Sequence, residues 1–516
     1  MKGPIARRLV VCVSALFMLA GLNLFASYPF YTPDEPDNDP DGVHLAPQPL
    51  PPFDPNLKAA PQGQAAFSGD PYVVGPIMTP TTTAPEAETN IAVNPVDPSN
   101  FVAQIIDYSL RTGGVLTNGV VKYAQSNDFG ATWQDNFVPT SGTYAFTSDN
   151  VKWLTERDPA MAIDGSGNVY LSSLYVKLAP GQQSNYGSNS FSSNHPPGGV
   201  YVCAAKLPDL TMTNSDCRPV FTYTRLGGNT HDVDRDWIAA DASTSQFAGN
   251  VYVAWVLYSG CSGSTCASKM IAFSRSTDHG VTWSPAIQIN GPQQAAVGWP
   301  MVTVGSDGTV YVAYQTFIQS NNLRQHWLAK SKDGGVTFAP AQSMTPLFRD
   351  VVFTAPYRRN AAPNLVVSSV PGAEYVYDVF ASQQGPGTNI NFVRSKLPKG
   401  AGGFTPIVKL NDSSAGQREY PAAAVDANGT LHVVWMDTRN SPTVSNYDVY
   451  ATYSKDLGVT FAPNARVTPA LINGDTDFLG DYFGMTVEPA TGVAHATWSN
   501  GGLAGGLLQT TTLTPP

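Results

Sequence analysis

The octapeptide STDHGVTW, from Ser276 to Trp283, recurs in closely similar form at three other places in the chain. The other copies are SNDFGATW at 126–133, SKDGGVTF at 331–338 and SKDLGVTF at 454–461, so all four follow S-x-D-x-G-x-T-[W/F]. In such a hairpin turn the Asp accepts backbone N–H bonds, the Gly adopts positive φ, and the Thr and the aromatic residue enter the next strand. The octets therefore predict four turns of one kind, in which Asp128, Asp278, Asp333 and Asp456 are structural residues.

A second pattern precedes the octets and extends beyond them. It consists of an apolar strand, a turn containing Asp or Gly, and an alternating strand that ends in an aromatic residue. Its starts are spaced about sixty residues apart, the length of one propeller blade. Five clear copies begin at Pro159, Trp237, Pro300, Pro421 and Phe483, and two weaker ones near Thr89 and Pro363. The pattern favours seven four-stranded blades, with six as the alternative, and a segment such as Tyr72 to Met78 could complete the last blade.

The octet resembles the Asp box, or BNR repeat, of the sialidase (neuraminidase) superfamily, and the resemblance covers roughly residues 86 to 510. It implies an all-β propeller whose Asp-box turns lie on the face opposite the active site. It also implies an exo-sialidase-like glycoside hydrolase with three arginines on a sugar carboxylate, a tyrosine nucleophile activated by a glutamate, and an aspartate acid/base. Family sialidases have six blades and an arginine motif in the first blade, where this chain has only Arg111.

Chemistry is expected where the chain enters each inner strand, because those loops surround one end of the central channel. The candidate nucleophiles are Tyr482 and Tyr420, with Glu419 as the base and Asp158 or Asp236 as the acid/base. A planar guanidinium meets a carboxylate bidentately, and a neutral tyrosine suits attack on an anionic sugar. The candidate substrate-binding residues are Arg157, Arg235, Arg418, Arg439, Asp437, Trp299 and Asp481. The alternative is a structural belt in which the same arginines pair with carboxylates.

Two other functions remain open at this stage. One is a propeller that binds a glycan or a protein at the cell surface without catalysis. The other is a polysaccharide lyase, in which His231 and a nearby tyrosine abstract a proton next to a uronate carboxylate. In each case we expect a carbohydrate or glycoconjugate partner, or a protein for the binding module, and no cofactor or metal is predicted.

Charge and composition exclude several classes of protein. The net charge is −10, and the basic residues form no cluster beyond the first few positions, which argues against nucleic acid and anionic membranes as partners. A disordered chain is excluded because 42% of the residues are hydrophobic. We expect a monomer.

The beginning of the chain predicts export. Lys2, Arg7 and Arg8 precede an apolar run, so residues 1–27 are interpreted as a signal peptide, or alternatively as an uncleaved anchor. Residues 28–62 are rich in proline and acid and predict a linker, and residues 63–516 the propeller. The protein is therefore expected to be secreted or to lie in the periplasm or at the cell surface, with no membrane span if the signal is cleaved.

Four cysteines remain outside the apolar run, an even number in a chain expected to be exported. The pairs Cys203–Cys217 and Cys261–Cys266 are favoured among three connectivities because each brackets a loop rich in Gly, Ser or Asn. Two local disulfides are predicted.

Overall fold

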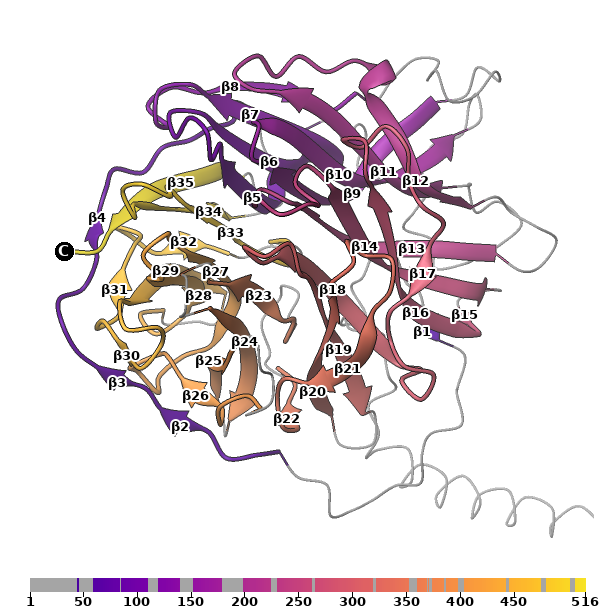
Figure 1. The fold of residues 1–516 in the computed structure, drawn as a ribbon. Coiled ribbons are helices and arrows are strands. Elements are labelled where there is room, and N and C mark those ends of the chain that lie inside the picture. The colour runs from indigo at the N-terminus through magenta and orange to yellow at the C-terminus, as the bar shows by residue number, and fades with distance from the viewer. Residues whose placement is uncertain are drawn as a thin grey trace, which may run out of the picture.

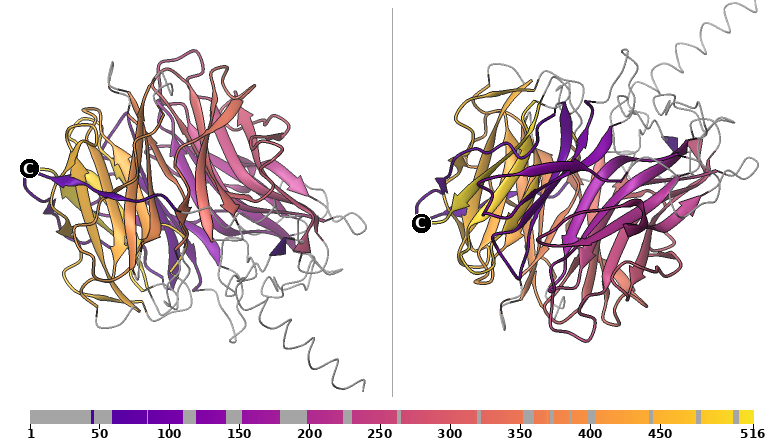
Figure 2. Two further views of the ribbon diagram at one scale, coloured as in Figure 1. Left: turned by 90° about the horizontal axis from the view of Figure 1, so that it is seen from below. Right: turned by 90° about the horizontal axis from the view of Figure 1, so that it is seen from above.

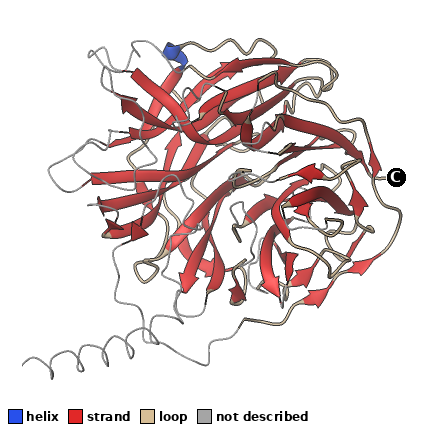
Figure 3. Cartoon of the chain, turned by 180° about the vertical axis from the view of Figure 1, so that it is seen from behind, coloured by secondary structure: helices blue, strands red, loops and turns tan. Residues whose placement is uncertain are grey.

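The computed structural model describes residues 44–45, 59–83, 85–109, 119–139, 152–178, 198–223, 230–261, 265–318, 322–351, 360–368, 370, 374–384, 387–397, 403–441, 445–474, 479–501 and 506–516. The predicted signal segment 1–27, most of the predicted linker and Arg111 lie outside these ranges. The described chain is β-structure (Figure 3), with a single 3-10 turn, η1 (Asn214–Asp216). None of its segments forms a helix long and apolar enough to cross a membrane.

Seven sheets form the blades of a propeller; each contains four antiparallel strands, and one further short strand joins each of blades 4, 5 and 6. Blade 1 contains β5 (Glu86–Val93), β6 (Phe101–Asp107), β7 (Val120–Ser126) and β8 (Gln134–Phe137). Blade 2 contains β9 (Lys152–Ile163), β10 (Asn168–Leu178), β11 (Gly198–Lys206) and β12 (Cys217–Tyr223). Blade 3 contains β13 (Thr230–Ala240), β14 (Val251–Cys261), β16 (Ser268–Ser276) and β17 (Ile287–Gln288). Blade 4 contains β18 (Val297–Val304), β19 (Val310–Ile318), β20 (Leu323–Ser331) and β21 (Ala339–Ser343), and β22 (Phe348–Arg349) also pairs with β20.

The remaining three blades follow in chain order. Blade 5 contains β23 (Asn364–Val367), β24 (Tyr375–Gln384), β25 (Gly387–Lys396) and β26 (Val408–Lys409). Blade 6 contains β27 (Arg418–Val425), β28 (Leu431–Asp437), β29 (Asn446–Ser454) and β31 (Ala465–Arg466), and β32 (Ile472–Asn473) also pairs with β29. Blade 7 contains β33 (Gly484–Val487), β34 (Ala494–Ser499), β35 (Leu508–Thr514) and the N-terminal β4 (Val73–Val74).

The innermost strands contact one another around the ring, and β33 of blade 7 contacts β5 of blade 1, so the circle is closed (Figure 1). The predicted all-β propeller with seven blades is confirmed. The predicted closing strand is also confirmed, because Val73 and Val74 of β4 pair with Thr514 and Leu513 of β35.

The segment before β4 lies along the outer edges of blades 5 and 6 as well. β2 (Gly63–Gln64) pairs in parallel with β26, and β3 (Ala66–Phe67) pairs in parallel with β30 (Thr460–Phe461). Figures 1 and 2 show this indigo segment passing over the orange and yellow blades. Farther upstream, β1 (His44–Leu45) pairs with β15 (Thr265–Cys266) of the blade 3 region. Of the predicted linker, residues 44–45 thus pair with a strand of the propeller, and residues 59–62 directly precede β2, which pairs with blade 5.

The four octets make the same turn between the third and fourth strands of their blades. In the copy at 331–338, Asp333 Oδ1 accepts from Ser331 Oγ at 2.7 Å and from the Thr337 N–H at 2.9 Å, while Asp333 Oδ2 accepts from Thr337 Oγ1 at 2.5 Å. Gly335 has φ of 80°, as the pattern requires. The strand registers place these turns at the far end of each blade from the start of its inner strand.

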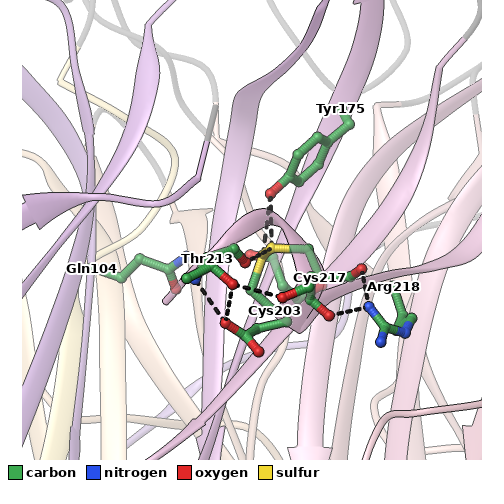
Figure 4. Close-up of a disulfide and its surroundings, with 9 residues drawn as sticks. Gln104, Tyr175, Cys203, Thr213, Cys217 and Arg218 are labelled. Atoms are coloured by element: carbon green, nitrogen blue, oxygen red, sulfur yellow. Dashed lines mark hydrogen bonds between the residues drawn. A yellow bond between two sulfur atoms is a disulfide. The ribbon is translucent and has the colours of Figure 1, made fainter. Parts of the chain in front are cut away.

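Both predicted disulfides are present. Cys203 and Cys217 face each other on the paired strands β11 and β12, and Cys261 and Cys266 close a short hairpin. Figure 4 shows the hydroxyl of Tyr175 directed at the first bridge, 3.3 Å from Cys203 Sγ. Structural disulfides of this kind are typical of extracellular proteins.

Candidate functional site

Five inner strands contain the same backbone irregularity. At Glu88, Asp158, Arg235, Trp299 and Tyr420, φ lies between 50° and 58°, although none of these residues is Gly. In each strand the register with its neighbour shifts at this point, as in a β-bulge. Left-handed backbone is unfavourable for such residues, and bulges redirect side chains. The bulges lie at the same end of the blades, opposite the octets, which makes this end the candidate functional face.

A pocket opens at this end of the central channel, and the empty space in and above it amounts to about 500 Å³. Its walls come from the entries to the inner strands of blades 3 to 7, and they include Arg235, Asp236, Trp299, Tyr420, Asp481 and Tyr482. A second cavity is bordered by the inner strands of all seven blades, which identifies it as the central channel, and its empty space including open solvent amounts to about 880 Å³. We refer to the first cavity as the mouth pocket.

Three buried carboxyl groups come together beside the mouth pocket. Oxygen atoms of Glu88, Asp158 and Asp481 lie within 4.8 Å of one another, although the residues belong to blades 1, 2 and 7. Such a group is compact enough to share a cation, but side-chain closeness alone does not establish a metal site. The predicted catalytic Asp158 and the predicted substrate contact Asp481 are thus brought together, and Glu88 joins them.

Tyr482 lies among these carboxyl groups. Its hydroxyl donates to the carbonyl oxygen of Pro159 at 2.9 Å. Burial raises the pKa of the phenol well above its usual value, and the nearby carboxyl groups of Glu88, Asp158 and Asp481 raise it further. The phenol is therefore neutral at ordinary pH. Any loss of its proton has to be coupled to a neighbouring base.

Asp236, in the wall of the mouth pocket, is a buried carboxyl group with a raised pKa. It is 2% exposed, its Oδ2 accepts from Ser172 Oγ, and its Oδ1 has no hydrogen-bond partner in the described part of the protein. Burial raises its pKa well above the ordinary value, and the charge of Asp158 adds to the effect. Asp236 is thus held in the protonated form, which is the form a proton donor requires.

Arg235 presents a fixed cation at the mouth pocket. Its guanidinium carbon lies 3.9 Å from the centre of the Trp299 ring, and its Nη1 donates to Asp234 Oδ2 at 2.5 Å. Its backbone N–H donates to Asp158 Oδ2 at 2.6 Å. Stacking and pairing together restrict the rotamers of this arginine. The predicted substrate contact Arg157 lies beside Asp158 at the start of the same bulge and is partly exposed.

Arg418, the third predicted clamp residue, is fully buried. Its Nε donates to Asp437 Oδ2 at 3.1 Å, its Nη1 to the carbonyl oxygens of Thr388 and Gly416 at 3.1 and 3.2 Å, and its Nη2 to the carbonyl oxygen of Ala415. These bonds tie blade 6 to blade 5. Arg418 therefore has the contacts of the structural belt that the sequence left open as the alternative.

Arg439 completes this belt. Its Nη2 donates to Asp437 Oδ2 at 2.7 Å and its Nη1 to Asp412 Oδ1 at 2.6 Å, and its guanidinium stacks on Tyr450. Neither Asp437 nor Arg439 lines the mouth pocket, and Glu419 is fully buried in β27. Tyr420 does line the mouth pocket, and its ring packs on Phe483.

His231, the histidine of the lyase hypothesis, lies in β13 with its Nδ1 2.9 Å from Ser259 Oγ. It does not line the mouth pocket.

The mouth pocket also contains polar and aromatic side chains that the sequence patterns do not predict as site residues, namely Trp237, Asn360 and Asn364. Trp237 stands in the sequence pattern only as the start of a repeat, and Asn360 belongs to none of the patterns. Asn360 Nδ2 donates to the carbonyl oxygen of Asp481 at 2.7 Å, and the Trp237 indole contacts the ring of Tyr482. Trp237 directly follows Asp236, so the same entry position that identified Asp236 could have pointed to it.

Comparisons with known proteins give structural similarity only. No model of a known protein family matches the chain, and no curated protein matches it. Similar solved structures include a leech intramolecular trans-sialidase complexed with 2,7-anhydro-Neu5Ac, with 10% identity, a TM-score of 0.44, and 79% of this chain and 69% of that one covered. Another is an α-L-arabinanase of Penicillium chrysogenum complexed with arabinobiose, with 13% identity, a TM-score of 0.42, and 88% and 98% coverage. An α-L-arabinofuranosidase of Fusarium graminearum has 12% identity, a TM-score of 0.42, and 87% and 98% coverage. A trans-sialidase and two arabinan-degrading enzymes are thus among the similar structures.

Proposed function

We propose that the protein is an exported glycoside hydrolase whose reaction takes place in the mouth pocket, on the terminal residue of an acidic sugar. The observation that carries the proposal is the buried Asp236 in the wall of the mouth pocket, whose pKa is raised well above its ordinary value by burial and by the neighbouring Asp158. Glycoside hydrolysis needs one carboxylic acid to protonate the leaving oxygen and a second group to act at the anomeric carbon.

In the proposed reaction, Asp236 gives its proton to the leaving glycosidic oxygen. Tyr482 attacks the anomeric carbon while its own proton passes to a carboxylate of the Glu88–Asp158–Asp481 group. A water molecule then attacks the anomeric carbon and gives a proton to Asp236, while the bond between the sugar and Tyr482 breaks and the carboxyl group returns its proton to the Tyr482 oxygen. The neutral phenol suits this role because a carboxylate on the sugar would repel an anionic nucleophile.

Arg235 and Trp299 support the choice of an acidic sugar. The guanidinium carbon already lies 3.9 Å from the centre of the Trp299 ring, and Asp234 orients the group, so binding a sugar carboxylate would require little ordering of this side chain. The rings of Trp299 and Tyr420 offer apolar faces to the sugar. Arg157 is proposed as a second contact, and Arg418 is left out because its donors are already bound.

Hydrolysis assays with 4-methylumbelliferyl glycosides test the proposal. The panel contains an N-acetylneuraminide and a glucuronide, with a glucoside as the neutral match of the glucuronide. Asp236→Asn should lower kcat by at least about 100-fold, the usual contribution of a general acid, and Tyr482→Phe should do the same for the attack. Asp278→Asn, on the far face, is the matched control and should leave turnover per folded molecule intact.

The stereochemistry of the product gives a further check, because a covalent sugar–tyrosine intermediate predicts retention at the anomeric carbon. Sugar binding without turnover in the wild type would instead identify a binding module and reject the catalytic proposal.

A further inference from the structure

Two aromatic rings from distant blades meet over the central channel. Trp237 belongs to β13 of blade 3, and Tyr482 precedes β33 of blade 7, which lies on a different side of the ring (Figure 1). Their ring centroids are 5.6 Å apart at an interplanar angle of 82°, an edge-to-face contact. Because other blades separate blades 3 and 7 in both directions around the ring, this contact spans the channel.

The Tyr482 side of the contact is anchored to two further blades. The hydroxyl of Tyr482 donates to Pro159 in blade 2, and the carbonyl oxygen of the preceding Asp481 accepts from Asn360 Nδ2 at the entry to blade 5. The phenol ring is therefore held at both its backbone and its hydroxyl end.

Three residues border both the mouth pocket and the central channel: Trp237, Met301 and Asn364. Met301 Sδ accepts from the Leu365 N–H at 2.9 Å, and Asn364 Oδ1 accepts from the Ala423 N–H at 2.9 Å, so the two smaller members are held by the backbone of blades 5 and 6. Trp237 is the largest of the three. These three residues form the boundary between the mouth pocket and the central channel, and Tyr482 packs against Trp237 from the mouth side.

We propose that Trp237 is the specificity-determining residue for ligand length, because its indole closes the floor of the mouth pocket and keeps a sugar chain out of the central channel. This inference rests on the proposed function. A terminal sugar reaches the carboxyl groups at the floor, its leaving group points out of the mouth, and a further sugar on the channel side would collide with the indole. Removing the indole joins the mouth pocket to a channel with room for a second unit.

The experiment is product analysis by mass spectrometry after brief digestion of two linear tetramers, tetragalacturonic acid and the α2,8-linked tetramer of N-acetylneuraminic acid. The wild type should release only single sugars in its first turnovers. Trp237→Ala should release disaccharides as well, with the ratio of disaccharide to monosaccharide raised at least tenfold. Met301→Ala removes a smaller part of the same boundary and should raise the ratio of disaccharide to monosaccharide less strongly. It replaces Trp237→Ala in the experiment if that variant does not fold. Trp283→Ala, in an octet on the far face, should keep the wild-type product pattern.

The outcomes separate the two proposals. The assignment of Trp237 is overturned if the wild type releases disaccharides in its first turnovers. It is also overturned if folded Trp237→Ala and Met301→Ala release only single sugars. Neither result contradicts the hydrolase proposal. Failure of the wild type to cleave either tetramer and every glycoside of the assay panel overturns the proposed function and this inference with it. Thermal melting of each variant distinguishes misfolding from a change in specificity.

Discussion

The hydroxyl of Tyr72 lies 2.7 Å from Nδ1 of His432, so a residue of the N-terminal segment is bonded to one 360 positions later in blade 6. Tyr72 is 6% exposed and immediately precedes β4, the strand that completes blade 7. Burial lowers the pKa of His432, so its ring is neutral and can accept this bond. The contact fastens the closing strand to a blade that it does not belong to.

Tyr72→Phe should lower the free energy of unfolding by about 1 to 3 kcal/mol, because it leaves a buried imidazole nitrogen without its partner. Denaturant unfolding measures the effect. Tyr375→Phe, at a partly buried tyrosine of blade 5, is the control. Equal stability of wild type and Tyr72→Phe would show that the hydroxyl does not secure the closing strand.

Asp333→Ala should lower the free energy of unfolding by roughly 1 kcal/mol, the usual loss when a turn carboxylate that accepts backbone bonds is removed. Turnover per folded molecule should not change, because the octet lies at the far end of the blade. A melting curve and a specific-activity assay on one sample decide this. Loss of turnover at unchanged stability would refute the structural role.

Acid should weaken this same turn. The hydrogen bonds from Thr337, Ser331 and Val336 outweigh the effect of burial and lower the pKa of Asp333 to about 2. Since the folded pKa lies below the ordinary value of 3.8, the stabilisation is present above that value and is lost as the pH falls toward 2. Stability curves of wild type and Asp333→Ala should therefore converge in this range, and a constant gap down to pH 2 would contradict the assignment.

Glu86 should make the protein less stable as the pH rises. Burial raises its pKa from the ordinary 4.5 to about 7. The folded state therefore binds a proton that the unfolded state has lost, and stability falls between pH 4.5 and 7 by up to about 3 kcal/mol. In Glu86→Gln this part of the slope should vanish, so the melting temperature of the variant should rise relative to wild type between pH 5 and 8. Parallel pH curves for the two proteins would exclude this source of pH dependence.

Arg418→Lys and Arg235→Lys should have opposite consequences. A lysine cannot reproduce the bonds of Arg418 to Asp437 and to three carbonyl oxygens, so the first variant should lose at least about 2 kcal/mol of stability without a change in sugar preference. The second should keep most of its stability and lose affinity for the acidic sugar relative to the neutral one. Calorimetric titration and thermal melting of both variants test this. A changed sugar preference in Arg418→Lys would show that Arg418 contributes to sugar binding.

Replacing Cys203 and Cys217 by serine should cost about 3 kcal/mol, as expected for a bridge that closes a loop of this length. Peptide mapping without reduction should recover both local pairs. A crossed link between Cys203 and Cys261 would be incompatible with the observed register of β11 and β12.

The sequence by itself determined what repeats. Each octet contains its own Ser, Asp, Gly and Thr, so its hydrogen bonds are local and could be predicted from eight residues. The blade count and the closing strand followed from the spacing of apolar segments, since each blade pairs strands that are close in sequence. The entry positions also identified Asp158, Asp236 and Arg235 as rim residues.

Only the tertiary structure decided how residues of different blades meet. The meeting of the Glu88, Asp158 and Asp481 carboxyl groups, the bond between Ser172 and Asp236, and the contact of Trp237 with Tyr482 all join segments that are far apart in the chain. Arg418 could not be distinguished from Arg235 by sequence, because both precede the inner strand of a repeat. In the structure the guanidinium of Arg418 is bonded to Asp437 and to backbone carbonyl oxygens. Burial and long-range charge set these roles, and neither is encoded in the spacing of a repeat.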